Sequence, residues 1–241
     1  MNILNVVQHT SADYLGLMED HLEGRRIRFR YFRPFTEQGT LPQSGDVCDG
    51  LLLMGGGPWG SAGGRNVPGL EQEVRLTQNM LDQGKPVIGI GLGAQILAIA
   101  AGGSSSPTSL EFEVGYATRV DERALEGFMP QRFPQVSYMR DRPVLPASAQ
   151  VLAEDEAARP AVFQIGKNAL GFVGHPGFKS AMAEDLVMEF EESPENPAPL
   201  LGKLRVMARE IEDALVPMMT GIIKVTGLMQ KRRRIPLELK S

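Results

Sequence analysis

The chain has 241 residues, a formal net charge of −4 and 42% hydrophobic residues, a size and composition that suit one globular domain with a sizeable core. The acidic balance, with a pI near 5.5, excludes a generally nucleic-acid-binding surface, so we expect no nucleic-acid partner. Cys48 is the only cysteine, which excludes intrachain disulfides and a cysteine zinc cluster. The N-terminus "MNILNVVQHT" lacks the features of a signal peptide, and the cytoplasm is therefore the expected location.

Apolar segments alternate with helix-like segments in the first hundred residues, which is the pattern of an α/β fold. Ser11 is a candidate cap and Gly24 a candidate end for the first helix. The apolar run "GLLLM" at 50–54 favours a strand buried on both faces, as in a parallel sheet. Strands are expected over residues 3–7, 26–32, 47–54 and 86–90, and helices over 11–24, 70–81 and 92–101.

The elements become shorter after Gly103. Residues 161–165 and 170–173 flank the turn-like "GKN" and predict a hairpin. The stretches "SSSP" at 104–107 and "SPENPAP" at 193–199 are expected to be loops, and the chain is mostly helical from residue 180. We therefore expect an α/β fold with a mostly parallel central sheet flanked by helices, a small antiparallel hairpin and a helical C-terminal extension. Residues 1–200 would form the domain, and residues 201–241 the extension with its basic tail.

The stretch "KPVIGIGLGAQILA" at 85–98 predicts a buried strand that runs directly into a helix, with Gly89 and Gly93 on either side of the junction. Such a nucleophile elbow needs glycines, because the reactive residue stands on a sharp, strained turn. The helix N-terminus would offer backbone N–H groups to an oxyanion. The junction residue is Gly91, which carries no side chain. Glycines between a strand and a helix can also be plain turn chemistry.

This stretch resembles the elbow of the class I (triad-type) glutamine amidotransferases, whose pattern is G-I-C-x-G-x-Q. Other motifs follow in the family's order over roughly residues 45–190. They are "CDGLLLMGGGP" at 48–58, "EVGY" at 113–116, "VLPASAQVLAEDE" at 144–156 and "AVFQIGKNALGFVGHPG" at 161–177. The resemblance implies the family's flavodoxin-like fold.

The family's reaction uses a cysteine thiolate, a histidine and a glutamate that orients the histidine. By this resemblance Gly91 stands at the cysteine position, His175 at the histidine and Gly177 at the glutamate. Met139 stands where relatives of the guanosine-monophosphate-synthase type have a histidine. The resemblance also implies ligand contacts by Gly56, Gly57, Leu92 and Gln95 in the glycine loop and elbow. Glutaminase activity by the family mechanism is therefore expected to be absent.

No other residue is expected to supply the nucleophile. Cys48 precedes its strand and lies about 20 Å from the end at which the glycine loop begins. The serines at 104–106 lie beyond the elbow helix. His9, His21 and His175 are the only histidines, and none has a metal-ligand spacing to another histidine or to cysteine. We expect neither a metal nor a cofactor.

Two segments are basic, "GRRIRFRYFR" at 24–33 and "KRRR" at 231–234. The first alternates as a half-buried strand does, with a solvated face or an acidic partner as alternatives. Ahead of the second, Met218, Ile222, Val225 and Met229 recur at helical spacing. This stripe would dock on its own domain, bind a partner or a second copy, or lie on a membrane surface, which we expect least.

The leading hypothesis is a catalytically degenerate amidotransferase-like protein that is a binding or complex-forming subunit beside a synthase-type enzyme or another protein partner, or that forms a homo-oligomer. One alternative is an enzyme of other chemistry that uses His175 in the same cleft. Another is a small-molecule sensor in which Gly91 makes room for a ligand.

Overall fold

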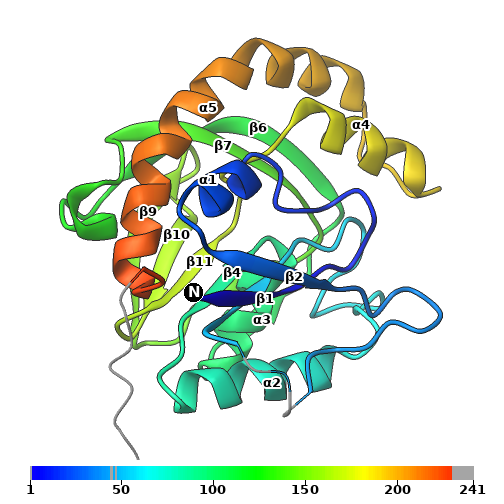
Figure 1. Cartoon of the computed structure of the whole chain (residues 1–241). Helices are drawn as coiled ribbons and strands as arrows, with labels where there is room; N and C mark the ends of the chain where they lie inside the picture. Colours follow the sequence, from blue (N-terminus) through cyan, green and yellow to red (C-terminus); the bar gives the residue numbers. More distant parts are fainter. Residues whose placement is uncertain (1, 44–45, 47, 230–241) are drawn as a thin grey trace, which may run out of the picture.

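A computed structural model describes residues 2–43, 46 and 48–229 (Figure 1). Eleven strands are described: β1 (Ile3–Val7), β2 (Arg28–Phe32), β3 (Gly50–Leu53), β4 (Val87–Ile90), β5 (Ser104–Ser106), β6 (Glu111–Arg119), β7 (Arg132–Met139), β8 (Arg142–Val144), β9 (Ala149–Asp155), β10 (Pro160–Ile165) and β11 (Ala169–Phe172). The helices are α1 (Met18–Gly24), α2 (Leu70–Asp82), α3 (Leu92–Ala100), α4 (Ser180–Glu189) and α5 (Pro197–Thr226), with a short 3-10 turn, η1 (Ala124–Gly127).

Nine strands form one sheet in the order β2-β1-β3-β4-β11-β10-β9-β6-β7. The half from β2 to β11 is parallel, and every pair from β11 to β7 is antiparallel. All residues of β3, β4 and β11 are buried, because helices cover both faces of a parallel sheet. The expected α/β fold is confirmed, and the sheet is mixed because the hairpin β10–β11 continues into β9, β6 and β7.

Helices cover the two faces of the sheet as separate layers. In Figure 1, α2 and α3 lie on one side of the parallel strands, while α1, α4 and α5 lie on the other side. The long helix α5 arches over β6 and β7. No helix within the described residues is long and apolar enough to cross a membrane.

Three expectations from the sequence are wrong. The first helix begins at Met18 rather than at Ser11, because residues 12–17 form a largely buried, irregular segment that turns at Gly16 with φ 61°. The serines at 104–106 form the strand β5, which pairs with Arg142–Val144 in a separate two-stranded sheet. The last helix already begins at Pro197, since proline is well tolerated in the first helical turn.

The C-terminal apolar stripe packs mainly on its own domain. Met218 and Ile222 are buried with residues of β1 and β4 in one core, Val225 packs against that core, and Met229 is exposed. Residues 231–234 lie outside the described residues, as does residue 47, where the third strand was expected to begin. The division of the chain at residue 200 stays a prediction.

Candidate functional site

The strand-to-helix elbow is formed as the glycine spacing predicts. Gly91 lies between β4 and α3 at φ 56°, ψ −114°, and its N–H donates to the Phe172 carbonyl at 2.8 Å. A Cβ atom added at Gly91 would meet one described atom within 4 Å, the Cα of Gly55 at 3.3 Å. By contrast, a Cβ at Gly93 would lie 2.2 Å from the Leu53 carbonyl oxygen. Packing therefore requires glycine at 93, whereas a Cβ at 91 would need only a small shift of the Gly55 backbone.

The glycine loop 55–57 lies against the elbow. A Cβ on Gly56 would come within 2.5 Å of the Leu92 side chain, so Gly56 and Leu92 are in direct contact as expected for one site. The Gly55 carbonyl accepts from His9 Nδ1 at 3.0 Å. The N–H of Gly56 belongs to the same trans peptide, so it points away from His9. Backbone donors of this kind suit an oxyanion or a carboxylate.

Helix α4 and the residues that follow it, as far as Glu192, form a cover over one end of this loop. A Cβ on Gly57 would lie 3.1 Å from the Phe190 ring and 3.3 Å from Leu186. Glu192, beyond α4, forms ion pairs with Arg65 and Arg140, and Arg140 Nε also donates to the Pro58 carbonyl at 3.1 Å. The cover thus lies against the Gly57 end of the glycine loop, and residues 55–57, 91 and 92 are all buried.

His175 is held by the main chain through both ring nitrogens. Nε2 lies 2.8 Å from the Tyr14 carbonyl oxygen, which can only accept, so Nε2 carries the proton. Nδ1 accepts from the Gly177 N–H at 3.0 Å. Burial lowers the pKa of His175 to about 4, so the ring is neutral at pH 7. In this arrangement both nitrogens already have partners, and the imidazole is fixed as part of the fold.

The N-terminal segment fills the space beside Gly177. A Cβ on Gly177 would lie 2.9 Å from Met18 Cγ and 3.0 Å from the Met18 nitrogen. The Gly177 carbonyl accepts from the Leu17 N–H at 2.9 Å, and a Cβ on Gly16 would lie 2.3 Å from the same carbonyl oxygen. A glutamate at 177 would therefore require residues 16–18 to move.

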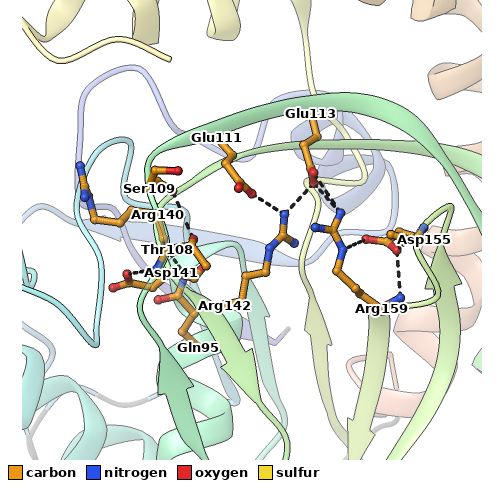
Figure 2. Close-up of polar contacts among 11 residues, drawn as sticks. Gln95, Thr108, Ser109, Glu111, Glu113, Arg140, Asp141, Arg142, Asp155 and Arg159 are labelled. Atoms are coloured by element: carbon orange, nitrogen blue, oxygen red, sulfur yellow. Dashed lines mark hydrogen bonds and ion pairs between the residues drawn. The ribbon is translucent and has the colours of Figure 1, made fainter. Parts of the chain in front are cut away.

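Gln95 contacts the protein with its whole amide. Its nitrogen donates to the carbonyls of Arg140 and Asp141 at 2.7 and 3.2 Å, and its oxygen accepts from the Ser61 hydroxyl. Asp141, at φ 61°, accepts from the N–H groups of Ser61 and Thr108. Figure 2 shows Gln95, Asp141 and Thr108 side by side. Gln95, which was expected to bind a ligand, thus connects the loop after residue 60 to the β7–β8 turn through hydrogen bonds.

Charged side chains continue from this turn along the antiparallel half of the sheet. Arg142 forms ion pairs with Glu111 and Glu113, and Arg159 forms ion pairs with Glu113 and Asp155 (Figure 2). Burial alone would raise the pKa of Glu113, but the hydrogen bonds from the two arginines outweigh it and hold the pKa below its ordinary value. Each of the three carboxylates is paired with an arginine, which suits a structural role.

A buried polar cluster that sequence reasoning missed lies behind the glycine loop. His9 Nε2 is 2.8 Å from the Glu73 carboxylate, and both side chains are 0% exposed. Burial alone would lower the pKa of His9, but the charge of Glu73 and the hydrogen bond to it outweigh this and raise it. Burial raises the pKa of the neighbouring Asp13 to about 7. His9 and Glu73 are 64 positions apart in sequence and belong to no motif, so no local sequence pattern could have predicted their contact.

Cys48 is buried just before β3, so the strand separates it from the glycine loop. Burial raises the pKa of its thiol. The serines of β5 follow α3 in the chain, and Ser105 is linked through the Ser61 hydroxyl to Gln95, one turn along α3 from the elbow. The structure thus places Gly56, Gly91 and Leu92 together, with Gln95 one turn along α3, and keeps Cys48 apart. Within the described residues, no group of three or more His, Cys, Asp or Glu side chains is placed to hold a metal ion.

The fold and the elbow define an α/β protein of the kind that carries its reactive residue between a central strand and the following helix. The family model "Glutamine amidotransferase class-I" matches residues 25–192. The chain therefore belongs to the class I glutamine amidotransferase family.

Solved structures agree with this at the level of the fold. A glutamine amidotransferase from Thermotoga maritima is 21% identical, with a TM-score of 0.77 over 93% of this chain and 98% of that chain. A glutamine amido transferase from Methylobacillus flagellatus is 22% identical, with a TM-score of 0.79 over 93% of this chain and 95% of the other. No curated protein matches the sequence.

Proposed function

We propose that this chain is an amidotransferase-like protein with a degenerate triad that does not hydrolyse glutamine and acts as a binding or complex-forming subunit of a cytoplasmic biosynthetic system. The observation that carries the proposal is the elbow itself: its geometry is intact at Gly91, but no nucleophile stands on it. Thiolate attack on a glutamine amide requires that nucleophile, and positioning alone does not replace the covalent step.

The surroundings of His175 support the same conclusion. A general base needs a free lone pair directed at the substrate, whereas Nδ1 accepts from Gly177 and Nε2 donates to Tyr14. This arrangement disfavours the alternative of other chemistry with His175 as base. The sensor alternative requires a movement that opens the buried glycine loop to a ligand, such as displacement of Phe190, which lies against Gly57.

The proposal assigns the chain a protein partner, either a synthase-type enzyme of the guanosine-monophosphate-synthase kind or a second copy of the chain. Class I amidotransferase subunits work against a synthase, and the family's fold, which such a partner would meet, supports this assignment. A surface for assembly can persist after the chemistry of the cleft is lost.

The first test is ammonia release from glutamine by the purified chain, followed with a coupled glutamate dehydrogenase assay. We expect no release above the protein-free blank, and Cys48→Ser should behave identically. Release of ammonia by both chains would refute the proposal, and release by the natural chain alone would assign the activity to Cys48.

The second test is the assembly state, measured by light scattering and by native mass spectrometry of the chain purified from its own cells. A complex of fixed stoichiometry with another protein, or a homo-oligomer, would support the proposal. A monomer that purifies alone would contradict the complex-forming role while leaving the chemistry test intact.

A further inference from the structure

A cavity of about 940 Å³ lies on the α2 face of the sheet, away from the elbow. Its floor includes Asn5 of β1, Leu51 of β3 and Met80 of α2, and its outer wall is formed by residues within 34–46. The described residues of the connection from β2 to β3 form turns and extended chain, so this face of β1 is covered by a loop where α/β folds commonly place a helix. The volume is within the range of small-molecule sites.

Asn5 is a polar residue in the middle of an apolar strand, "ILNVV". It is 0% exposed, and its Oδ1 accepts from Arg30 Nη2 at 3.4 Å. A guanidinium can only donate, so the contact atom on Asn5 must be the oxygen. The amide nitrogen Nδ2 has no partner among the described residues. A buried donor without a partner destabilises the fold, and a ligand acceptor would satisfy it.

The walls of the cavity supply polar groups and cations. Lys85 and Arg75 line it. Gln72, Asn79 and Gln83 follow at helical spacing on the same exposed side of α2. The acidic side chain in the lining, Asp46, is paired with Arg30 at 3.0 Å, which leaves Lys85 as a cation near the floor. The backbones of β1 and β4 are about 10 Å apart, two strand spacings, so a ligand of that length would reach from Asn5 towards Lys85.

We propose that this cavity binds a small organic oxyanion, a carboxylate or a phosphate ester, with one oxygen on Asn5 Nδ2 and its charge near Lys85. Asn5 is part of the cavity floor but its Nδ2 is buried, so its side chain must turn or the loop formed by residues 34–43 must shift outward before a ligand oxygen reaches it. Cys48 and Lys85 precede β3 and β4, whereas the elbow follows β4. The site is therefore separate from the glycine loop, and its failure would not bear on the proposed function.

The single thiol provides a site-specific reporter, because Cys48 lines the cavity and is the only cysteine. The rate of Cys48 alkylation by iodoacetamide is measured by mass spectrometry with and without millimolar citrate or ribose 5-phosphate. We expect at least one probe to slow alkylation threefold or more and to shift the Asn5 side-chain amide signal in ¹⁵N NMR spectra. Protection by citrate alone indicates a carboxylate site, and protection by the sugar phosphate indicates a phosphate site. Unchanged alkylation and spectra with both probes would overturn the proposal.

Three variants separate a binding role from a structural one. Lys85→Gln should weaken binding about tenfold, since a charge-assisted bond is lost. Lys167→Gln, in the exposed turn between β10 and β11, is the matched control and should leave binding unchanged. Asn5→Leu should abolish protection while the free protein melts at the same or a higher temperature, because an unpaired buried amide is replaced by an apolar group of similar size. A lower melting temperature together with normal binding would show that Asn5 serves only the fold.

Discussion

Replacing Gly91 tests whether the elbow is as strained as the backbone angles indicate. The residue lies at φ 56°, ψ −114°, and holding a non-glycine residue in such a region costs roughly 1–3 kcal/mol. The smaller conformational freedom of the unfolded variant offsets about 0.4–1 kcal/mol of this. A Cβ at 91 would meet only Gly55 Cα at 3.3 Å within the described structure, a tight contact that a small shift of the Gly55 backbone would relieve. We expect Gly91→Ala to lose about 1–2 kcal/mol of unfolding free energy.

The measurement is thermal and urea unfolding of Gly91→Ala and Gly91→Cys beside the natural chain. For a chain of this size each kcal/mol lowers the melting temperature by about 2–4 °C, so both variants should melt about 2–8 °C lower. Alanine and cysteine at position 91 share the same backbone strain. The difference in unfolding free energy between the two variants therefore measures the contribution of the thiol group alone.

The introduced thiol reports on the elbow's electrostatics. The N-terminus of α3 should lower the pKa of a thiol at 91, whereas burial raises the pKa of Cys48. Iodoacetamide at neutral pH should therefore modify residue 91 faster than Cys48, with Cys48→Ser as the background that simplifies the readout. Glutamine hydrolysis should stay absent. Unchanged stability in both variants would show that the backbone at 91 is relaxed, and equal alkylation of the two thiols would show that the helix N-terminus does not act there.

Three further perturbations follow from the same contacts. Gly91→Cys combined with Gly177→Glu should melt below Gly91→Cys and should still release no ammonia, because the Met18 nitrogen lies 3.0 Å from the new Cβ; activity equal to that of a glutaminase would contradict this crowding. The pKa of Asp13 is raised to about 7 and that of His175 is lowered to about 4, from ordinary values of 3.8 and 6.5. As pH rises from 4 to 6.5, Asp13 ionises in the unfolded chain but stays protonated in the fold, which lowers the unfolding free energy. Over the same interval His175 loses its proton in the unfolded chain while it is already neutral in the fold, which raises the unfolding free energy, and the two effects largely cancel. Asp13→Asn should unmask a rise in unfolding free energy of about 3 kcal/mol over that interval, measured by urea titration; a flat profile would contradict the assignment of a neutral His175. Ile222→Ala, at 0% exposure, should cost about 2–5 kcal/mol, while Val206→Ala, at 82% exposure on the same helix, should change stability by less than about 0.5 kcal/mol.

The parallel half of the fold could be predicted because its signals are local. The strand before the elbow is a short apolar run, and the glycines that follow it mark the turn into α3. The close approach of Gly93 to the Leu53 carbonyl confirms the physical reason for that spacing. The contact of Gly56 with Leu92 could likewise be anticipated, because the carboxyl ends of adjacent parallel strands lie at the same edge of the sheet.

The antiparallel half and the environment of His175 depend on pairings that no local pattern encodes. β9 joins β6 through Ala117 and Asp155, which lie far apart in the chain. Ser11 has the chemistry of a helix cap, but the segment after it is buried by Gly177 and by the β-sheet core instead of forming a helix. Tertiary burial overrode the local preference, and the same segment supplies the Tyr14 carbonyl that holds His175.

Packing and hydrogen bonds within the fold account for most residues of the elbow motif, although Gly91 at its centre carries no side chain. Gly89 and Gly93 are fixed by the fold itself, since a Cβ at Gly89 would lie 2.3 Å from the Gly93 carbonyl oxygen. Gln95 is fixed by its bonds to Arg140 and Asp141. These residues would be kept whether or not the cleft reacts with anything. Position 91 is less constrained by packing, because a Cβ there would approach only Gly55 Cα, at 3.3 Å, although its φ of 56° still favours glycine. Among these three glycines, position 91 is therefore the one at which packing would most readily accept a Cβ atom, and glycine there leaves the contacts of Gly89, Gly93 and Gln95 unchanged.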